Sequence, residues 1–289
     1  MRDTVKGFIY SLIAVIFLST NFITAKFGLT GFNPETFSLV WTVFATCYSF
    51  IIALTSPESR KQLFFSNNIV PLIILGIITG ITMLLSWSAL SVLDPVFSSF
   101  LWRLFPVITV ISGVIFLKEK LMRDEIIAII IMFLGSIVSI KGEWNIVGKG
   151  VILTLLAECA GAIQLIIAKT YVNRIHPNIM VLYRVAIASI FISIYAIASH
   201  KIDFNVRISC WYITMLGAFL GPCASFLFLF RSYKYWELSK SSILLILQPI
   251  LVFPMAYLFL GTVPNIKEFI GGLIILIGAF WLAFIQIKK

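Results

Sequence analysis

The stretch "ITAKFGLTGFNP", residues 23–34, has a counterpart in the second half of the chain, "IIAKTYVNRIHP", residues 166–177. The two are 143 positions apart, and this spacing places Lys26 opposite Lys169. Self-similarity at one fixed spacing is the mark of an internal repeat. The same spacing matches further pairs: Asn21 with Gln164, Ser98-Ser99 with Ser241-Ser242, Pro106 with Pro249, Phe116-Leu117 with Phe259-Leu260, Glu125 with Glu268, and Gly135 with Gly278.

The composition of both halves is that of a membrane protein. The 289 residues are 60% hydrophobic and only 12% charged, whereas a soluble domain is about 45–50% apolar and about 25% charged. The net charge of +10 does not indicate nucleic acid, because the basic residues stand singly between apolar runs and form no basic stripe. We therefore predict a polytopic membrane protein that has the lipid bilayer, and no nucleic acid, as its partner.

Apolar runs separated by short polar breaks predict ten transmembrane helices, each near the ~20 residues that cross a bilayer. The expected limits are 7–27, 36–55, 69–90, 94–117, 124–140, 147–170, 178–199, 209–232, 239–260 and 267–287. Five helices per half is an odd number, so the second half enters the membrane from the opposite side. The predicted fold is all-α, with residues 1–143 and 144–289 as two inverted five-helix repeats. In such folds the substrate site lies near the midplane between the repeats.

The distribution of lysine and arginine predicts the orientation. Of the 22 basic residues, 14 fall in loops on the N-terminal side, 6 on the other side, and Arg103 and Arg184 inside spans. Positive charge is retained on the cytoplasmic side. We expect both termini in the cytoplasm and a multi-pass protein of a bacterial-type cytoplasmic (inner) membrane.

A resemblance rests on "ITAKFGL…NP", "SWSAL", a proline in the fourth span before "FLKEKL", and the second-half pieces "LIIAKTY…HP" and "LQPILVFPMAYLFLG". With these pieces the chain resembles the drug/metabolite transporter superfamily, in particular its EamA-type members. It departs from the pattern at Thr262, where members often have an acidic residue; Glu119 keeps that acid in the first half. The resemblance implies transport of small metabolites, often proton-driven export, with helices one, three, four, six, eight and nine around the cavity and five and ten at the periphery.

Two deep charged residues have no counterpart in the other repeat. Arg103 aligns with Ile246, and Glu158 aligns with Val15. A charge within the membrane is expensive and marks a functional site unless it is paired structurally. We interpret Arg103 and Glu158 as a cavity pair or substrate clamp; the alternative is a structural salt bridge. The predicted substrate-binding residues are Arg103, Glu158, Trp102, Trp87, Asn21, Gln164, Ser99 and Gln248.

Other polar and small residues are assigned structural roles. Asp94 precedes Pro95 and is expected at a helix N-terminus. Arg184 lies only about six residues into its span, so its long side chain is expected to extend to the cytoplasmic surface. The shared prolines Pro106 and Pro249 are expected to kink helices near the midplane. Pairs of glycines with small-xxx-small spacing are expected to allow close helix packing: Gly76 and Gly80 in the first half, Gly217 and Gly221 in the second.

The function expected from these residues is secondary active transport, with export favoured, of a small organic metabolite such as an amino acid or a related zwitterion or anion. The alternative is an uptake carrier or exchanger for a nucleotide-like or cationic metabolite. No catalytic residue, metal site or cofactor is expected beyond a coupling proton, because the four cysteines have no metal-ligand spacing and the loops are short. A membrane enzyme and a packing scaffold fit less well, and the protein is expected as a monomer or homodimer.

Overall fold

The computed structural model describes residues 3–63, 69–105, 107–108, 122–139, 144–235 and 244–288, and the regular elements in these ranges are helices. In chain order they are α1 (Asp3–Gly28), α2 (Pro34–Thr55), α3 (Pro57–Gln62), α4 (Ile69–Val92), α5 (Pro95–Leu101), η1 (Trp102–Leu104), α7 (Arg123–Ser139), α8 (Trp144–Tyr171), α9 (Pro177–Ala198), α10 (Ile208–Ala218), η2 (Phe219–Ser225), α11 (Phe226–Tyr235), α13 (Gln248–Leu260) and α14 (Ile266–Lys288). The predicted all-helical membrane fold is confirmed.

Six helical stretches in the described ranges are long and apolar enough to cross a membrane: Val5–Gly28, Pro34–Thr55, Ile69–Val92, Gly148–Tyr171, Pro177–Ala198 and Ile208–Tyr235. Each agrees with one predicted span to within a few residues at either end. The count of ten spans stays a prediction, since parts of the fourth and ninth expected spans lie outside the described residues. The cytoplasmic location of the termini also stays a prediction.

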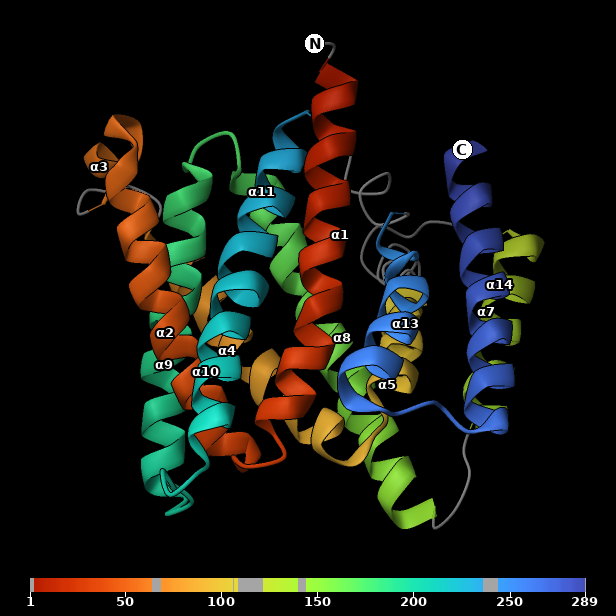
Figure 1. Cartoon of the computed structure of the whole chain (residues 1–289). Helices are drawn as coiled ribbons and strands as arrows, with labels where there is room; N and C mark the ends of the chain where they lie inside the picture. Colours follow the sequence, from red (N-terminus) through yellow and green to blue (C-terminus); the bar gives the residue numbers. More distant parts are fainter. Residues whose placement is uncertain are drawn as a thin grey trace.

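The two halves run in opposite directions (Figure 1). Helix α1 descends from the N-terminus, whereas its counterpart α8 starts at the far end and ascends; α2 and α9, the second helices of the two halves, are likewise antiparallel. The chain ends lie on the same side of the molecule. Packing follows the same symmetry, because α4 packs on α8 as α11 packs on α1, and the pairs α2–α9 and α7–α14 join equivalent helices. This is the arrangement expected of inverted repeats; the boundary between residues 143 and 144 stays a prediction.

Three residues that each precede a proline are helix caps. The side chains of Asn33, His176 and Asp94 each accept a hydrogen bond from a backbone N–H two or three residues further on, at 2.8–3.2 Å. A proline follows each of them, and its fixed φ suits the first turn of a helix. The expectation that Asp94 begins a helix is therefore confirmed, and the matched "NP" and "HP" pairs mark the starts of α2 and α9.

The matched lysines also share one role. Lys26, in the last turn of α1, donates to three backbone carbonyls at the end of α4, those of residues 90, 91 and 93, at 2.8–3.2 Å. Lys169, in the last turn of α8, donates to the carbonyl of Tyr233 near the end of α11 at 2.8 Å. A cation at a helix C-terminus satisfies free carbonyls and complements the helix dipole. Each lysine thus joins the first and third helices of its own half.

The paired glycines lie where helices approach closely. A Cβ atom at Gly80 would stand 2.7 Å from Phe191 of α9, and one at Gly217 would stand 2.6 Å from Thr24 of α1. Neither distance leaves room for a side chain without a shift of the neighbouring helix. The predicted close-packing role of these glycines is confirmed.

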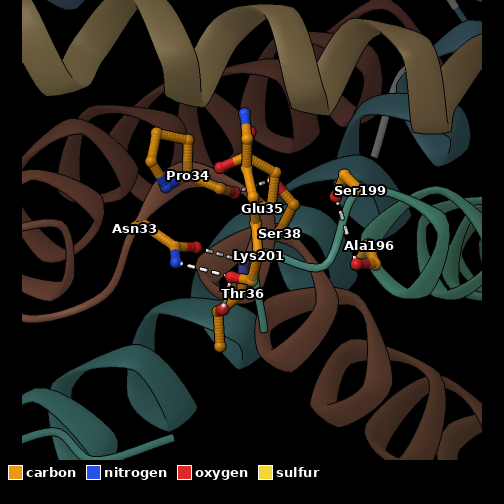
Figure 2. A network of polar contacts seen from close by, with 8 residues as sticks. All are labelled: Asn33, Pro34, Glu35, Thr36, Ser38, Ala196, Ser199 and Lys201. Carbon is orange, nitrogen blue, oxygen red and sulfur yellow. Dashed lines mark hydrogen bonds and ion pairs between the residues drawn. The ribbon is translucent and has the colours of Figure 1, made fainter. Parts of the chain in front are cut away.

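Polar contacts hold α2 and α9 together at both ends. Figure 2 shows the end away from the chain termini, where Asn33 and Thr36 donate to the carbonyl of Lys201 at 2.7 and 3.2 Å and the Lys201 ammonium lies 2.5 Å from Glu35. At the opposite end the side-chain amide of Asn178 in α9 donates to the carbonyl of Ile52 in α2 at 3.2 Å. The α2–α9 pair is consequently fixed at both of its ends.

One feature of the backbone differs from expectation and one agrees with it. The eighth expected span is not one regular helix, because a π-helical segment, η2, separates α10 from α11 and contains Pro222. Residues 244–245 are helical and 246–247 form a turn before α13, which has Pro249 in its first turn. The helical path of the ninth expected span is thus interrupted next to Pro249, as expected, since a proline has no N–H for the carbonyl four residues earlier. Pro106 and the pair Ser241-Ser242 lie outside the described residues.

Candidate functional site: a polar cavity between the repeats

A cavity of about 150 Å³ lies between the two halves. Its wall comes from α1, α2, α4, α5 and η1 of the first half, and from α8, α9, η2, α11 and the start of α13 of the second. No residue described in α7 or α14 lines it, as expected for peripheral helices. Helices α2 and α9 contribute Trp41 and Arg184, although only the first, third and fourth helices of each half were expected at the cavity.

Arg103 lines the cavity and is 4% exposed. It stands in η1, where the α-helical turns of α5 give way to a tighter turn. Its Nε donates to the carbonyl of Ser99 at 3.3 Å, one Nη donates to the carbonyl of Leu245, and the other donates to Gln248 Oε1 at 2.6 Å. Two of these acceptors belong to the second repeat, so the guanidinium bridges the two halves across the cavity wall.

Glu158 lies beside this site but does not line the cavity. It is fully buried in α8, and neither carboxylate oxygen has a hydrogen-bond partner among the described residues. It is near enough to interact electrostatically with Arg103, without a hydrogen bond. The expected direct pair is therefore not formed, because the guanidinium of Arg103 is taken by backbone and amide oxygens of the opposite half.

Helix α8, the sixth expected span, forms one wall of the cavity. Thr154, Gly161 and Leu165, which share the helical face of Glu158, all line the cavity. Gln164 lines it as well, although the helical period places Gln164 well round the helix from Glu158. The cavity is thus wide enough to reach both sides of the α8 face.

Gln164 organises a second polar cluster. Its Oε1 accepts from Thr79 at 2.7 Å and from Arg184 Nη1 at 3.3 Å, while its Nε2 donates to Thr82 at 2.7 Å. Arg184 also donates to the carbonyl of Pro222 at 2.8 Å, and its guanidinium carbon lies 3.5 Å from the centre of the Phe226 ring. The cluster joins α4, α8, α9 and η2 through one amide and one guanidinium.

The expectation that Arg184 extends to the surface is wrong. Arg184 is 1% exposed and lines the cavity. The first residues of α9, from Pro177 to Leu182, are all buried, so no path leads from Arg184 along its helix to water. The sequence signal that could have placed Arg184 at the cavity is the same as for Arg103, namely a cation within an apolar span. The closeness of Arg184 to the end of its span was misleading.

Tryptophans form the apolar side of the cavity. Trp87 and Trp102 line it, as expected, and so does Trp41 of α2, which was not expected there. The rings of Trp41 and Trp87 are 5.3 Å apart, and Phe37 packs 4.8 Å from Trp41. Trp41 was missed because the second helix of each half was placed outside the cavity.

The remaining predicted residues fall into two groups. Asn21 and Gln248 line the cavity; Asn21 Oδ1 is buried without a hydrogen-bond partner and packs against Gly221. Ser99 is buried, donates to the carbonyl of Val96 at 2.6 Å and is not in the wall, whereas its neighbour Ser98 is. The structure thus brings six of the eight predicted residues to one cavity and leaves Ser99 and Glu158 just behind its wall.

Comparison with known proteins supports the repeat and the fold. The sequence matches the EamA-like transporter family model twice, over residues 5–141 and 148–284. An uncharacterized transporter of Bacillus subtilis, YyaM, is 24% identical over 91% of this chain and 88% of its own length. One from Synechocystis is also 24% identical, over 96% of this chain and 86% of its own. A crystal structure of another protein matches this chain with a TM-score of 0.66 at 14% identity. The match covers 100% of this chain and 99% of the other, and it is evidence of the fold alone.

Proposed function

The chain belongs to the EamA-like transporter family and is a membrane transporter, and on this premise we propose that it is a secondary active exporter of a small organic anion or zwitterion. The substrate is bound in the cavity between the repeats, and access alternates as one half moves against the other. The transport cycle involves no chemical step, and the protein resides in the cytoplasmic (inner) membrane.

The observation that carries this proposal is the position of Arg103. It is a buried cation that lines a cavity and donates to Leu245 and Gln248 of the opposite repeat. Motion of one half against the other changes these contacts, and a substrate carboxylate competes for the same donors. The planar guanidinium suits carboxylate or phosphate in bidentate geometry, so Arg103 is proposed as a group that recognises substrate and senses which access state the protein is in.

Glu158 is proposed as the proton carrier. Its carboxyl group is fully buried, has no hydrogen-bond partner among the described residues, and lies within electrostatic range of Arg103. Intramembrane acids with this environment serve as proton relays in transporters. A change in the contacts of Arg103 alters the charge that Glu158 senses, which would couple proton release to movement of the substrate.

The alternative substrate classes fit the cavity less well. A cationic metabolite meets two arginines in the wall, Arg103 and Arg184, and no lining acid among the described residues. A nucleotide-like metabolite is far larger than a cavity of about 150 Å³. We therefore propose an anion or zwitterion of a few carbon atoms.

Transport by the purified protein in proteoliposomes tests this proposal. We expect saturable counterflow of at least one radiolabelled short-chain carboxylate or amino acid. We expect no counterflow of a radiolabelled organic cation or nucleotide. Efflux from loaded cells that express the chain, compared with uptake, establishes direction. Saturable counterflow of the cation alone would contradict the proposal.

A further inference from the structure

The charged side chains around the cavity do not balance. The buried charged residues in the described ranges are Arg103, Arg184, Glu158 and Glu125. Glu125 is in the first turn of α7, a helix that contributes nothing described to the cavity wall. Two cations and one acid therefore remain at or beside the cavity, and an unbalanced charge in a low-dielectric interior is costly.

The acid lies with Arg103. Glu158 interacts electrostatically with Arg103, whereas no described carboxylate acts on Arg184. The described hydrogen-bond and ring partners of Arg184 are neutral: the amide oxygen of Gln164, the carbonyl of Pro222 and the ring of Phe226. Cys223, which also lies near Arg184, is a buried cysteine and not a carboxylate. Among the residues that the structure describes, the positive charge left unbalanced is consequently that of Arg184.

Arg184 also has unused hydrogen-bonding capacity. A guanidinium carries five N–H donors, of which two make hydrogen bonds here, and one of those is long at 3.3 Å. Its Nε is buried without a partner. The bond to Gln164 is the long one, so a carboxylate that approaches from the cavity forms a bond between two opposite charges at the expense of one to a neutral acceptor.

Resting on the proposed function, we infer that the substrate carries one net negative charge and that its carboxylate binds Arg184 beside Gln164. In the state in which Glu158 has released its proton, one negative charge neutralises the set formed by Arg103, Arg184 and Glu158, whereas a zwitterion adds none. A cavity of this volume holds a ligand of about six heavy atoms, so the substrate is a short carboxylate. Its uncharged part faces the indole wall of Trp41 and Trp87.

Four small molecules of nearly the same shape separate the possible charges. Lactate is an anion, lactamide is neutral, L-alanine is a zwitterion and L-alaninamide is a cation. A ligand that binds the folded state raises the melting temperature by mass action. We expect lactate to raise the melting temperature of the purified full chain at neutral pH, and the other three to leave it unchanged. A shift by L-alanine without one by lactate, or equal shifts by lactate and lactamide, would overturn the inference.

Variants of the Arg184 cluster locate the anion. Arg184→Gln is expected to weaken lactate binding by about tenfold or more, the loss of at least one charge-assisted hydrogen bond, and Arg184→Lys to keep part of it. Gln164→Glu has the shape of the native side chain and places a carboxylate next to Arg184, so it should abolish the lactate shift even if the arginine variants do not fold. Unchanged lactate binding in Gln164→Glu would contradict the inference.

A control variant and the counterflow assay separate this inference from the function itself. Glu35→Gln removes the ion pair at the far end of α2 (Figure 2) and should leave the lactate shift intact. If alanine shows counterflow and lactate neither binds nor moves, the protein is a transporter of zwitterions and the inference alone fails. If no small carboxylate or amino acid shows counterflow, the proposed function fails as well.

Discussion

Arg103 and Arg184 are both buried arginines at one cavity, yet their surroundings differ. Arg103 has an acid within electrostatic range and donates to two groups of the opposite repeat. Arg184 is held by an amide, a backbone carbonyl and an aromatic ring, all of them neutral. The difference indicates that the protein supplies the counter-charge at Arg103, and that at Arg184 the counter-charge is brought by a ligand.

The backbone that carries the two arginines also differs. Arg103 stands in a short 3₁₀ turn that follows α5, and its contacts reach the start of α13. Arg184 belongs to α9, which is fixed to α2 at both ends, and it binds the carbonyl of Pro222 inside the π-helical segment η2. Arg103 is therefore placed to respond to movement between the halves, whereas the hydrogen-bond partners of Arg184 lie in its own half.

The largest effect is expected at Arg103. Arg103→Met removes the bonds to Leu245 and Gln248 and the cation that acts on Glu158. It should lower the free energy of unfolding by about 3–5 kcal/mol, the range found when one of two interacting buried charges is removed. The double variant Arg103→Met/Glu158→Leu should recover most of that loss in denaturant titrations of purified protein. Independent, additive losses in the two single variants would show that the pair is not coupled.

An intermediate effect is expected from the two repeat-related amides. Gln164→Leu removes the three hydrogen bonds between its amide and Thr79, Thr82 and Arg184 and should lower the free energy of unfolding by about 2 kcal/mol. Asn21→Leu removes an amide oxygen that has no hydrogen bond, so its loss should be smaller. Thermal unfolding of both variants side by side gives the comparison, and equal losses would remove the special role given to the Gln164 cluster.

A smaller loss is expected from Arg184→Met than from Arg103→Met. The variant removes two hydrogen bonds to neutral acceptors, but it also removes an unbalanced buried charge, and the two effects offset each other to about 1 kcal/mol or less. Its melting temperature without ligand should therefore remain near that of the native chain. A loss as large as that of Arg103→Met would mean that Arg184 has a structural role instead.

The smallest effect is expected at the surface, where Lys201 pairs with Glu35 (Figure 2). The hydrogen bond that the Lys201 ammonium donates to Glu35 raises the pKa of Lys201 above its ordinary value of 10.5. The contribution of the pair is thus fully present below about pH 10 and is lost only as the pH rises through that raised pKa. Lys201→Met should leave the melting temperature at pH 7 nearly unchanged, because exposed pairs contribute little; a clear drop would contradict this ranking.

Much of the fold and part of the site could be predicted from the sequence. The repeat could be read from the fixed spacing between Lys26 and Lys169. Both lysines are present because each binds carbonyls at the end of the third helix of its half. The cavity position of Arg103 followed from its depth in an apolar run. Arg184 was misplaced because distance from a helix end says nothing about whether neighbouring helices cover that end. The contacts of Arg103 were misassigned because the sequence reading paired Arg103 with an acid and did not consider the carbonyl of Leu245, which Pro249 leaves free four residues later.

The most direct test of the difference between the two arginines uses one isosteric change at each. Gln164→Glu places a carboxylate beside Arg184, whereas Gln248→Glu places a second acid beside Arg103 and Glu158. Melting temperatures of the two variants are compared without ligand at neutral pH. The account predicts that Gln164→Glu is at least as stable as the native chain and that Gln248→Glu is less stable. The reverse order would contradict it, because Arg184 would then already be balanced and Arg103 would be the cation in need of an anion.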